Sequence, residues 1–183
     1  MRAPLALSAL FFSTLACSEP VVGVRLRFPS VQTFLVTNTI TVDVYDGEGS
    51  AEKSPDAICR ALSVSTSVAP KGVQALKSSG NTNACDLLAG GIGFSGVDVG
   101  RRVFFAEAVD FQDTAILRGC TVADVFGDPQ KLSDNDKAEA DKVGGANAFV
   151  DVQLATLPTY PDALTPTCAD VAAKCEENKP CVP

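Results

Sequence analysis

The sequence predicts a mainly β protein, an antiparallel β-sandwich with a short, disulfide-stapled C-terminal helix. Several short segments alternate apolar and polar residues with a period of two, which is typical of strands with one face in water. The chain also contains 14 glycines and 11 prolines, which supply turns, and it has almost no long helical periodicity. Short strands joined by such turns favour two packed antiparallel sheets.

The first two expected strands show the alternation most clearly. Residues 21–28 alternate apolar residues with Arg25 and Arg27. A second strand begins at Thr39 and ends in a turn after Asp46, where glycines follow. Further strands are expected, in chain order, at residues 58–64, 73–76, 102–109, 115–126 and 148–154.

The segment VGRRVFFAEAVDFQDTAILRGCTV predicts two adjacent strands around a turn at residues 110–113. The second of these strands is expected to break at Gly119. This pattern resembles the closing hairpin of an immunoglobulin-like or transthyretin-like domain. The resemblance implies a sandwich of that class, immunoglobulin-like in the first place, for residues 23–157.

Residues 158–183 form a segment of different character, rich in proline and cysteine. Its first part, through residue 166, is expected to be a linker, and Thr167 with Asp170 resembles a capping box that would start a short helix. A helix this short is marginal alone, so disulfides on its inward face would fix it to the sandwich. The residues that helical spacing places on one face are Cys168, Val171 and Cys175.

Residues 1–16 have the layout of a secretory signal peptide. Arg2 precedes an uncharged stretch from residue 5 to residue 15, and small residues gather near its end. The apolar stretch is too short to cross a bilayer, which takes roughly 20 residues. We therefore expect the protein to be exported.

Cys17 follows this leader directly, in the stretch STLACSEP. Residues 14–17 resemble the lipobox of bacterial lipoproteins, which ends in a small residue followed by the cysteine that receives a diacylglyceryl group. Ala16 and Cys17 fit this pattern, whereas Thr14 stands where that family prefers leucine and Leu15 where it prefers a small residue.

The resemblance implies lipidation of Cys17, residues 17–22 as anchor and linker, and a membrane as partner. Two or three acyl chains, at ~0.8 kcal/mol per buried CH₂, would anchor the protein firmly. Ser18 is not the aspartate retention signal of some envelope lipoproteins, which favours the outer membrane. The alternative is cleavage near Ala16, which would release a soluble protein with one odd thiol.

Seven cysteines are consistent with this expectation, because lipidation of Cys17 leaves an even number for disulfides in an oxidising compartment. Three of the six lie in the body and three in the C-terminal segment, so at least one bridge must join the two if all six pair. Fifteen connectivities are possible. The preferred pair is Cys59 with Cys85, whose loop would contribute roughly 3 to 4 kcal/mol. The six cysteines are Cys59, Cys85, Cys120, Cys168, Cys175 and Cys181.

The charge balance is acidic. The chain has 15 basic and 22 acidic residues, for a formal charge of -7, and loss of the leader with Arg2 makes it -8. Nucleic-acid binding requires a basic surface, and anionic lipid headgroups attract basic segments. The composition therefore argues against nucleic acid as a partner and leaves membrane contact to the anchor.

Two stretches resemble known ligand sites but lack part of the required pattern. GIGFSG, residues 91–96, fits the dinucleotide fingerprint, yet a strand is expected after this glycine-rich turn where a helix is required. Residues 133–141 gather four acids that could attract calcium, but Ala138 and Glu139 break the EF-hand pattern. Ser133 with Asp136 makes a capping box, so we expect a short capped helix in a solvated loop there.

The chain contains no histidine, which excludes the Ser-His-Asp and Cys-His arrangements. The spacing of the last three cysteines is also unlike a zinc site. Paired carboxylates for glycoside cleavage must stand about 5 to 9.5 Å apart. The acids that could converge in this way are Asp98, Glu107, Asp110 and Asp113.

These observations predict a non-enzymatic cell-envelope lipoprotein that presents its sandwich to an envelope protein partner. No cofactor, metal or catalytic residue is expected. Two alternatives remain: a ligand-binding module that uses residues 128–147 for calcium, and a carboxylate-based hydrolase.

Overall fold

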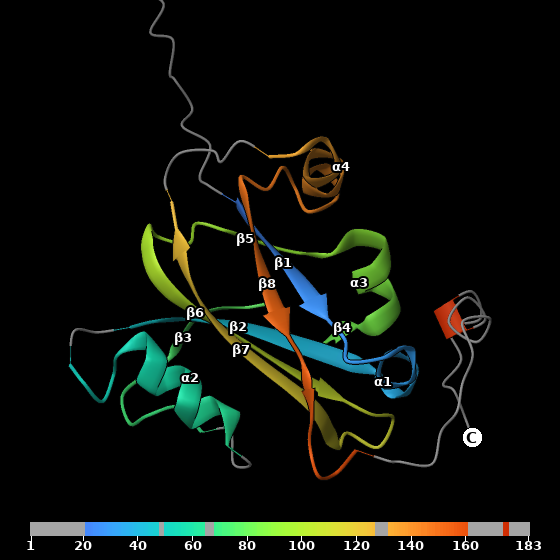
Figure 1. The fold of residues 1–183 in the computed structure, drawn as a ribbon, viewed down its shortest axis with the longest axis horizontal. Helices are drawn as coiled ribbons and strands as arrows, with labels where there is room; N and C mark the ends of the chain where they lie inside the picture. The colour runs from blue at the N-terminus through green and yellow to red at the C-terminus, as the bar shows by residue number, and fades with distance from the viewer. Residues whose placement is uncertain (1–20, 48–49, 65–67, 127–131, 161–173, 176–183) are drawn as a thin grey trace, which may run out of the picture.

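The computed structural model describes residues 21–47, 50–64, 68–126, 132–160 and 174–175. The protein is mainly β, with two sheets built mostly from antiparallel strands and several short helices (Figure 1). None of the helices in these ranges is both long enough and apolar enough to cross a membrane.

The smaller sheet has three strands in the order β5-β1-β8. The central strand β1 (Val21–Arg27) is antiparallel to β5 (Ile92–Ser95) and parallel to β8 (Ala148–Gln153). Pairing with β5 ends at Val24 opposite Ile92, whereas pairing with β8 continues to Arg27. Among the described residues, the second half of β1 therefore has a strand partner on the β8 side alone.

The larger sheet has the order β3-β2-β6-β7-β9, and β4 also pairs with β2. Strands β6 and β7 form the hairpin expected around residues 110–113. The break expected at Gly119 is wrong, because β7 runs through this residue. The strands of the larger sheet are β3 (Ala75–Ser78), β2 (Thr39–Asp46), β4 (Thr82–Asn83), β6 (Gly100–Val109), β7 (Ala115–Val125) and β9 (Ala155–Thr156).

The main core contains residues from both sheets, which face each other across it (Figure 1). Val24 of β1 and Val152 of β8 contribute from the smaller sheet, and Val42 of β2 and Phe104 of β6 from the larger one. The chain passes from one sheet to the other after β8, since β8 pairs with β1 and β9 pairs with β7. The alternation read from the sequence thus supplies one apolar face to each sheet.

Helix α2 (Pro55–Ser63) covers the other face of the larger sheet. Ile58 and Leu62 of α2, one helical turn apart, are buried against Val103 and Phe105 of β6. Because β6 is buried on both faces, it is almost continuously apolar, as in a strand covered on both sides.

Residues 58–64 are therefore mostly helical, and the strand expected there is wrong. Ser54 caps the helix by accepting a hydrogen bond from the Ala57 backbone N–H, and Pro55 follows it at the first helical position. The cap and the proline precede the apolar run at residues 58–64. Ile58 and Leu62 in this run are four residues apart, which is the spacing of one helical turn.

Two disulfides connect the described parts of the chain. Cys59 of α2 bridges to Cys120 of β7, and Cys85 bridges to Cys175, with Cα–Cα distances of 5.6 and 5.2 Å. The preference for Cys59 with Cys85 is wrong, because each of these residues is bridged to another cysteine. The parity argument is confirmed by the second bridge, which joins the body to the C-terminal segment. Cys17, Cys168 and Cys181 lie outside the described residues.

Helices α1, α3 and α4 also lie within the described ranges. Helix α1 (Val31–Val36) begins with a capping box of Ser30 and Thr33, and α3 (Ala84–Gly90) is capped by Asn83; neither was expected. Helix α4 (Asp134–Lys142), capped by Ser133, confirms the capped helix expected in the acidic stretch. The turn expected at residues 91–96 is wrong, because Ile92–Ser95 form strand β5. The strand expected after it is confirmed as β6. Of the helix expected in the C-terminal segment, only residues 174 and 175 are described, and both are helical.

Candidate functional site

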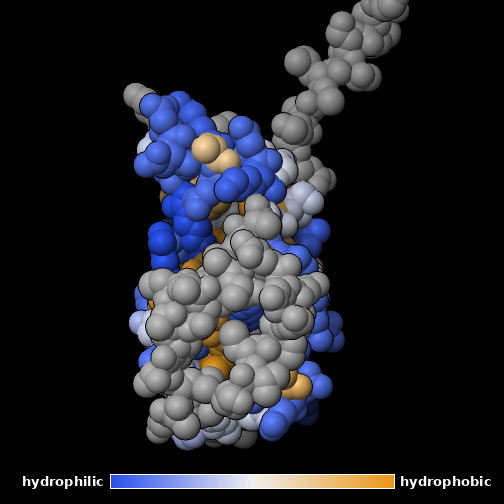
Figure 2. Space-filling view, turned by 90° about the vertical axis from the view of Figure 1, so that its right-hand side faces the viewer, coloured by the Kyte–Doolittle hydropathy of each residue, from blue (hydrophilic) through white to orange (hydrophobic). Residues whose placement is uncertain are grey.

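A cavity of about 200 Å³ opens between β1 and helices α1, α3 and α4. Its apolar lining includes Leu26 and Phe28 from the β1 segment, Phe34 from α1 and Leu87 from α3. In Figure 2, hydrophilic residues gather over α4 at the top, and hydrophobic residues are visible lower on the same face. The charged residues that line the cavity are Arg25, Arg27, Glu139 and Lys142.

Local sequence explains why these elements meet. The capping box at Ser30 starts α1 shortly after β1 ends, so Phe34 returns to Phe28, and the two rings meet edge to face at 5.3 Å. Gly91 ends α3 at a positive φ of 68°, a conformation that glycine adopts without strain, and β5 starts at the next residue. The cavity lies where α3 gives way to β5.

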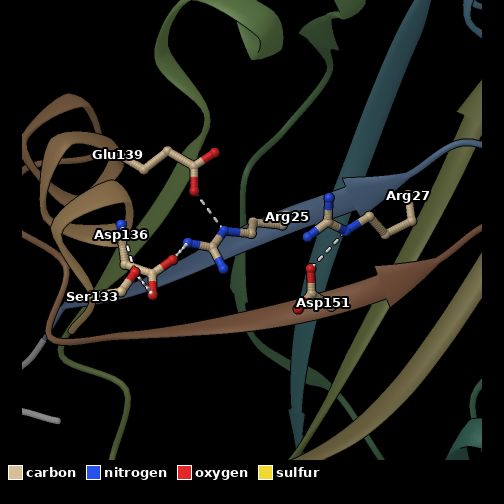
Figure 3. A network of polar contacts seen from close by, with 6 residues as sticks. All are labelled: Arg25, Arg27, Ser133, Asp136, Glu139 and Asp151. Carbon is tan, nitrogen blue, oxygen red and sulfur yellow. Dashed lines mark hydrogen bonds and ion pairs between the residues drawn. The ribbon is translucent and has the colours of Figure 1, made fainter. Parts of the chain in front are cut away.

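Arg25 connects β1 to α4 (Figure 3). Its Nε donates to Glu139 Oε2 at 2.6 Å, and a terminal guanidinium nitrogen contacts Asp136. The guanidinium also lies 3.9 Å from the centre of the Phe149 ring. Gly23 makes room for this ring, because a Cβ there would lie only 2.4 Å from Phe149 Cε1. The side chain of Arg25, only 19% exposed, thus holds α4 against the smaller sheet.

Hydrogen bonds set the electrostatics of this contact. The Ser133 hydroxyl, 2.7 Å from Asp136 Oδ2, and then the Arg25 guanidinium lower the pKa of the Asp136 carboxyl. Partial burial disfavours the charge of Arg25, but hydrogen bonds from Arg25 to Asp136 and Glu139 outweigh it, so its pKa is raised. Both shifts favour the charged forms of Arg25 and Asp136. A second pair, Arg27 with Asp151 at 2.8 Å, lies nearby on the surface.

This arrangement bears on the calcium hypothesis for residues 128–147. Asp136 and Glu139 are directed to Arg25, and Asp134 pairs with Lys137 at 2.8 Å. Within the described part of the chain, no three acidic or cysteine side chains cluster closely enough to hold a metal ion. Asp136 and Glu139 thus fasten α4 to β1, and the described acids of this stretch offer no preformed calcium site. Calcium binding by the whole stretch stays a prediction.

The four acids considered for hydrolysis do not all come together: Asp110 and Asp113 share a turn, but Asp98 lies far from them. Asp98 precedes β6 and Asp110 follows it, so at about 3.3 Å per residue the two are separated by roughly 30 Å or more. Glu107 pairs with Arg118 at 2.6 Å, and Asp110 accepts backbone hydrogen bonds in the hairpin turn that also contains Asp113. No carboxylate pair of the kind that cleaves glycosides spans the two ends of this strand.

Lys174 lies beside the cavity and was not found by sequence reasoning. Its Nζ donates to the backbone oxygen of Phe34 at 2.6 Å and to that of Thr37, at the C-terminal end of α1. The residue is 5% exposed, and its neighbour Cys175 is bridged to Cys85 on α3. A lysine in a polar tail carries no sequence signal for this position, which depends on a contact across about 140 residues of chain.

Comparison with known proteins identifies no relative. No family model matches the sequence, and neither a curated protein nor a solved structure is similar to it. The residues and their geometry are therefore the basis for a functional proposal.

The lowered pKa of Asp136 predicts a pH-dependent attachment of α4. A depressed carboxyl pKa stabilises the folded state above the unfolded value of about 3.9, and this contribution is lost as the pH falls through the folded value. We expect Asp136→Asn to melt below the wild type at pH 7, and this difference to vanish in strongly acidic buffer. The matched control is Asp134→Asn, in the same helical turn but 97% exposed, which should show little difference at either pH. Equal melting temperatures for Asp136→Asn and the wild type at pH 7 would contradict this account.

Proposed function

We propose that the protein is an exported, lipid-anchored envelope protein whose β-sandwich, immunoglobulin-like in class, binds another envelope protein without catalysing a reaction. The observation that carries this proposal is Cys17, placed directly after a signal-peptide leader and shortly before the fold begins. The outer membrane is the favoured location, because Ser18 does not match the aspartate retention signal.

Strand β1 starts so close to Cys17 that a lipid there would keep the folded body near the membrane. The first strand begins at Val21, inside the residues assigned to the linker, so only residues 18–20 separate it from Cys17. Four residue steps span at most about 14 Å even when fully extended. A lipid on Cys17 would therefore hold the folded body close to the membrane surface.

The disulfides support export. Cys59–Cys120 and Cys85–Cys175 join segments that are 61 and 90 residues apart. Such bridges form and persist in oxidising compartments and are rare in the cytosol. Two sheets that share one core likewise support the sandwich class proposed here.

The cavity beside β1 supports a binding role. It combines an apolar wall with a few charged groups, which is the usual composition of a ligand site. The chain has no histidine, and Asp98 and Asp110 lie at opposite ends of a long strand. The acidic side chain that lines the cavity, Glu139, is itself paired with Arg25, so binding is a better account of this surface than hydrolysis.

Intact mass spectrometry of the protein purified from its own membranes tests the anchor. We expect the mass of residues 17–183 plus acyl chains, and complete loss of the acyl mass in Cys17→Ala. The control Ser18→Ala keeps the cysteine and should stay acylated. An unacylated wild-type mass with one readily alkylated thiol would overturn the lipid anchor and indicate a released protein.

A further inference from the structure

In the part of the chain that the structure describes, the second half of β1 has a free backbone edge on the side away from β8. Successive residues of a strand direct their N–H and C=O groups to alternate sides. Arg27 directs its groups to β8, since its carbonyl accepts the Leu154 N–H at 2.9 Å. Leu26 therefore directs its N–H and C=O to the other side, where the pairing with β5 has already ended at Ile92. Within the described ranges, no strand pairs with Leu26 on that side.

The cavity lies along this free edge. Its lining includes Leu26 together with Leu87, Gly90 and Gly91, which belong to α3 and the turn that leads into β5. The volume of about 200 Å³ exceeds that of the engineered cavity of about 150 Å³ that binds benzene. One large apolar side chain would therefore fit beside the free peptide group.

The charges around the cavity select an acidic ligand. The whole chain has a formal charge of -7, yet the cavity is lined by three basic side chains and one acidic one. Arg25 is already neutralised by α4, whereas Arg27 is engaged only in an exposed pair, which contributes little. Lys142 is the third basic side chain, and no ion pair of this exposed lysine is seen within the described ranges.

We infer that an extended segment of a partner protein adds to β1 at Leu26, with an apolar side chain in the cavity and acidic neighbours facing Arg27 and Lys142. The alternation of a strand explains this pattern, because residues on either side of the buried one point to the opposite face. Main-chain hydrogen bonds supply affinity in this mode of recognition, and the pocket supplies specificity. The inference deepens the proposed binding role and rests on it, but it does not depend on the lipid anchor.

Amide hydrogen exchange measured by NMR tests the free edge. In the purified mature protein, the Leu26 amide should exchange at least about tenfold faster than those of Arg25 and Arg27, which face β8. Equal protection at all three positions would show that the edge is already covered and would overturn the inference.

Titration with short peptides tests the ligand chemistry. The probes are acetylated five-residue peptides SDXDS, in which X is each large apolar residue in turn. At least one should shift and protect the Leu26 amide, and N-methylation of residue X should weaken binding by roughly tenfold, through loss of a main-chain hydrogen bond. If no probe shifts this amide at millimolar concentration, or if the methylated probe binds equally well, the inference is wrong.

Two matched pairs of variants locate the site. Leu87→Trp fills the cavity and should abolish binding, whereas Leu76→Trp, on the exposed strand β3, should bind like the wild type. Lys142→Glu should weaken binding by roughly tenfold, and Lys77→Glu should leave it unchanged. Equal effects within the lysine pair would overturn the site even if the tryptophan variants fail to fold. If the protein is unacylated but binds a peptide, the proposed lipid anchor is wrong and the binding site stands. If the protein is acylated but binds no peptide, the binding site is wrong and the anchor stands.

Discussion

Replacing Phe104 with alanine should destabilise the protein by about 3–5 kcal/mol. Phe104 is fully buried in the core that contains residues of both sheets. Its removal loses the transfer free energy of the ring and leaves a cavity that the rigid sheets can only partly fill. Urea unfolding of the two proteins, followed by circular dichroism, gives the difference in the free energy of unfolding.

Phe126→Ala is the matched control for this prediction. Phe126 follows the end of β7 and is 53% exposed, so the same substitution should change the free energy of unfolding by no more than about 0.5 kcal/mol. If Phe104→Ala is too unstable to purify, the milder Phe104→Leu should still destabilise measurably. Similar effects at positions 104 and 126 would contradict a core shared by the two sheets.

Removing the Cys59–Cys120 disulfide, with alanine at both positions, should cost about 4 kcal/mol in the chain-entropy model. The bridge closes a loop of 61 residues, so its loss gives the unfolded chain many more conformations. It also releases α2 from β7, on the sheet face with the second apolar cluster. The melting temperature should fall by roughly 10 °C.

The control is to measure both the variant and the wild type in reductant. The reduced wild type has lost the same constraint, so the difference in melting temperature between the two proteins should largely disappear. A peptide map of the oxidised protein should recover Cys59 linked to Cys120. Recovery of Cys59 linked to Cys85 would instead contradict the structure and restore the pairing first expected from the sequence.

Strands with one buried face were predictable from the sequence alone. The alternation in residues 21–28 and 148–154 corresponds to β1 and β8, and the hairpin around residues 110–113 corresponds to β6 and β7. The capping box at Ser133 likewise corresponds to α4. These signals are reliable because the period of two and the cap both depend on neighbours within a few residues.

Elements that depend on distant partners were not predictable in this way. The break expected at Gly119 does not occur. The glycine there lets the backbone of β8 approach closely, because a Cβ would lie 2.4 Å from the Gln153 carbonyl oxygen. Glycine in a strand marks either a bulge or a close approach of another backbone, and only the fold distinguishes them. The apolar run at residues 58–64 was ambiguous between strand and helix for the same reason.

The candidate site shows the same division. The sequence placed Arg25 and Arg27 on one face of a strand and the acids of α4 on a capped helix, but it gave no reason to join Arg25 to Asp136 and Glu139. Among the described residues, Leu26 lacks a strand partner on the β5 side because β5 is shorter than β1. No local pattern reports the length of a partner strand that comes about 70 residues later.

The sequence by itself determined the acidic charge, the absence of histidine and the alternation of the strands, and it predicted a leader before Cys17. It also required a bridge between body and tail if all six remaining cysteines pair. Only the tertiary structure decided that Cys85 bridges to Cys175, that α2 covers the second face of the larger sheet, and that a cavity remains beside β1. The physical reason is the separation along the chain between the residues that interact. Periodicity, caps and composition act between near neighbours, whereas disulfide partners, doubly buried strands and unpaired edges result from how the sheets and helices pack together.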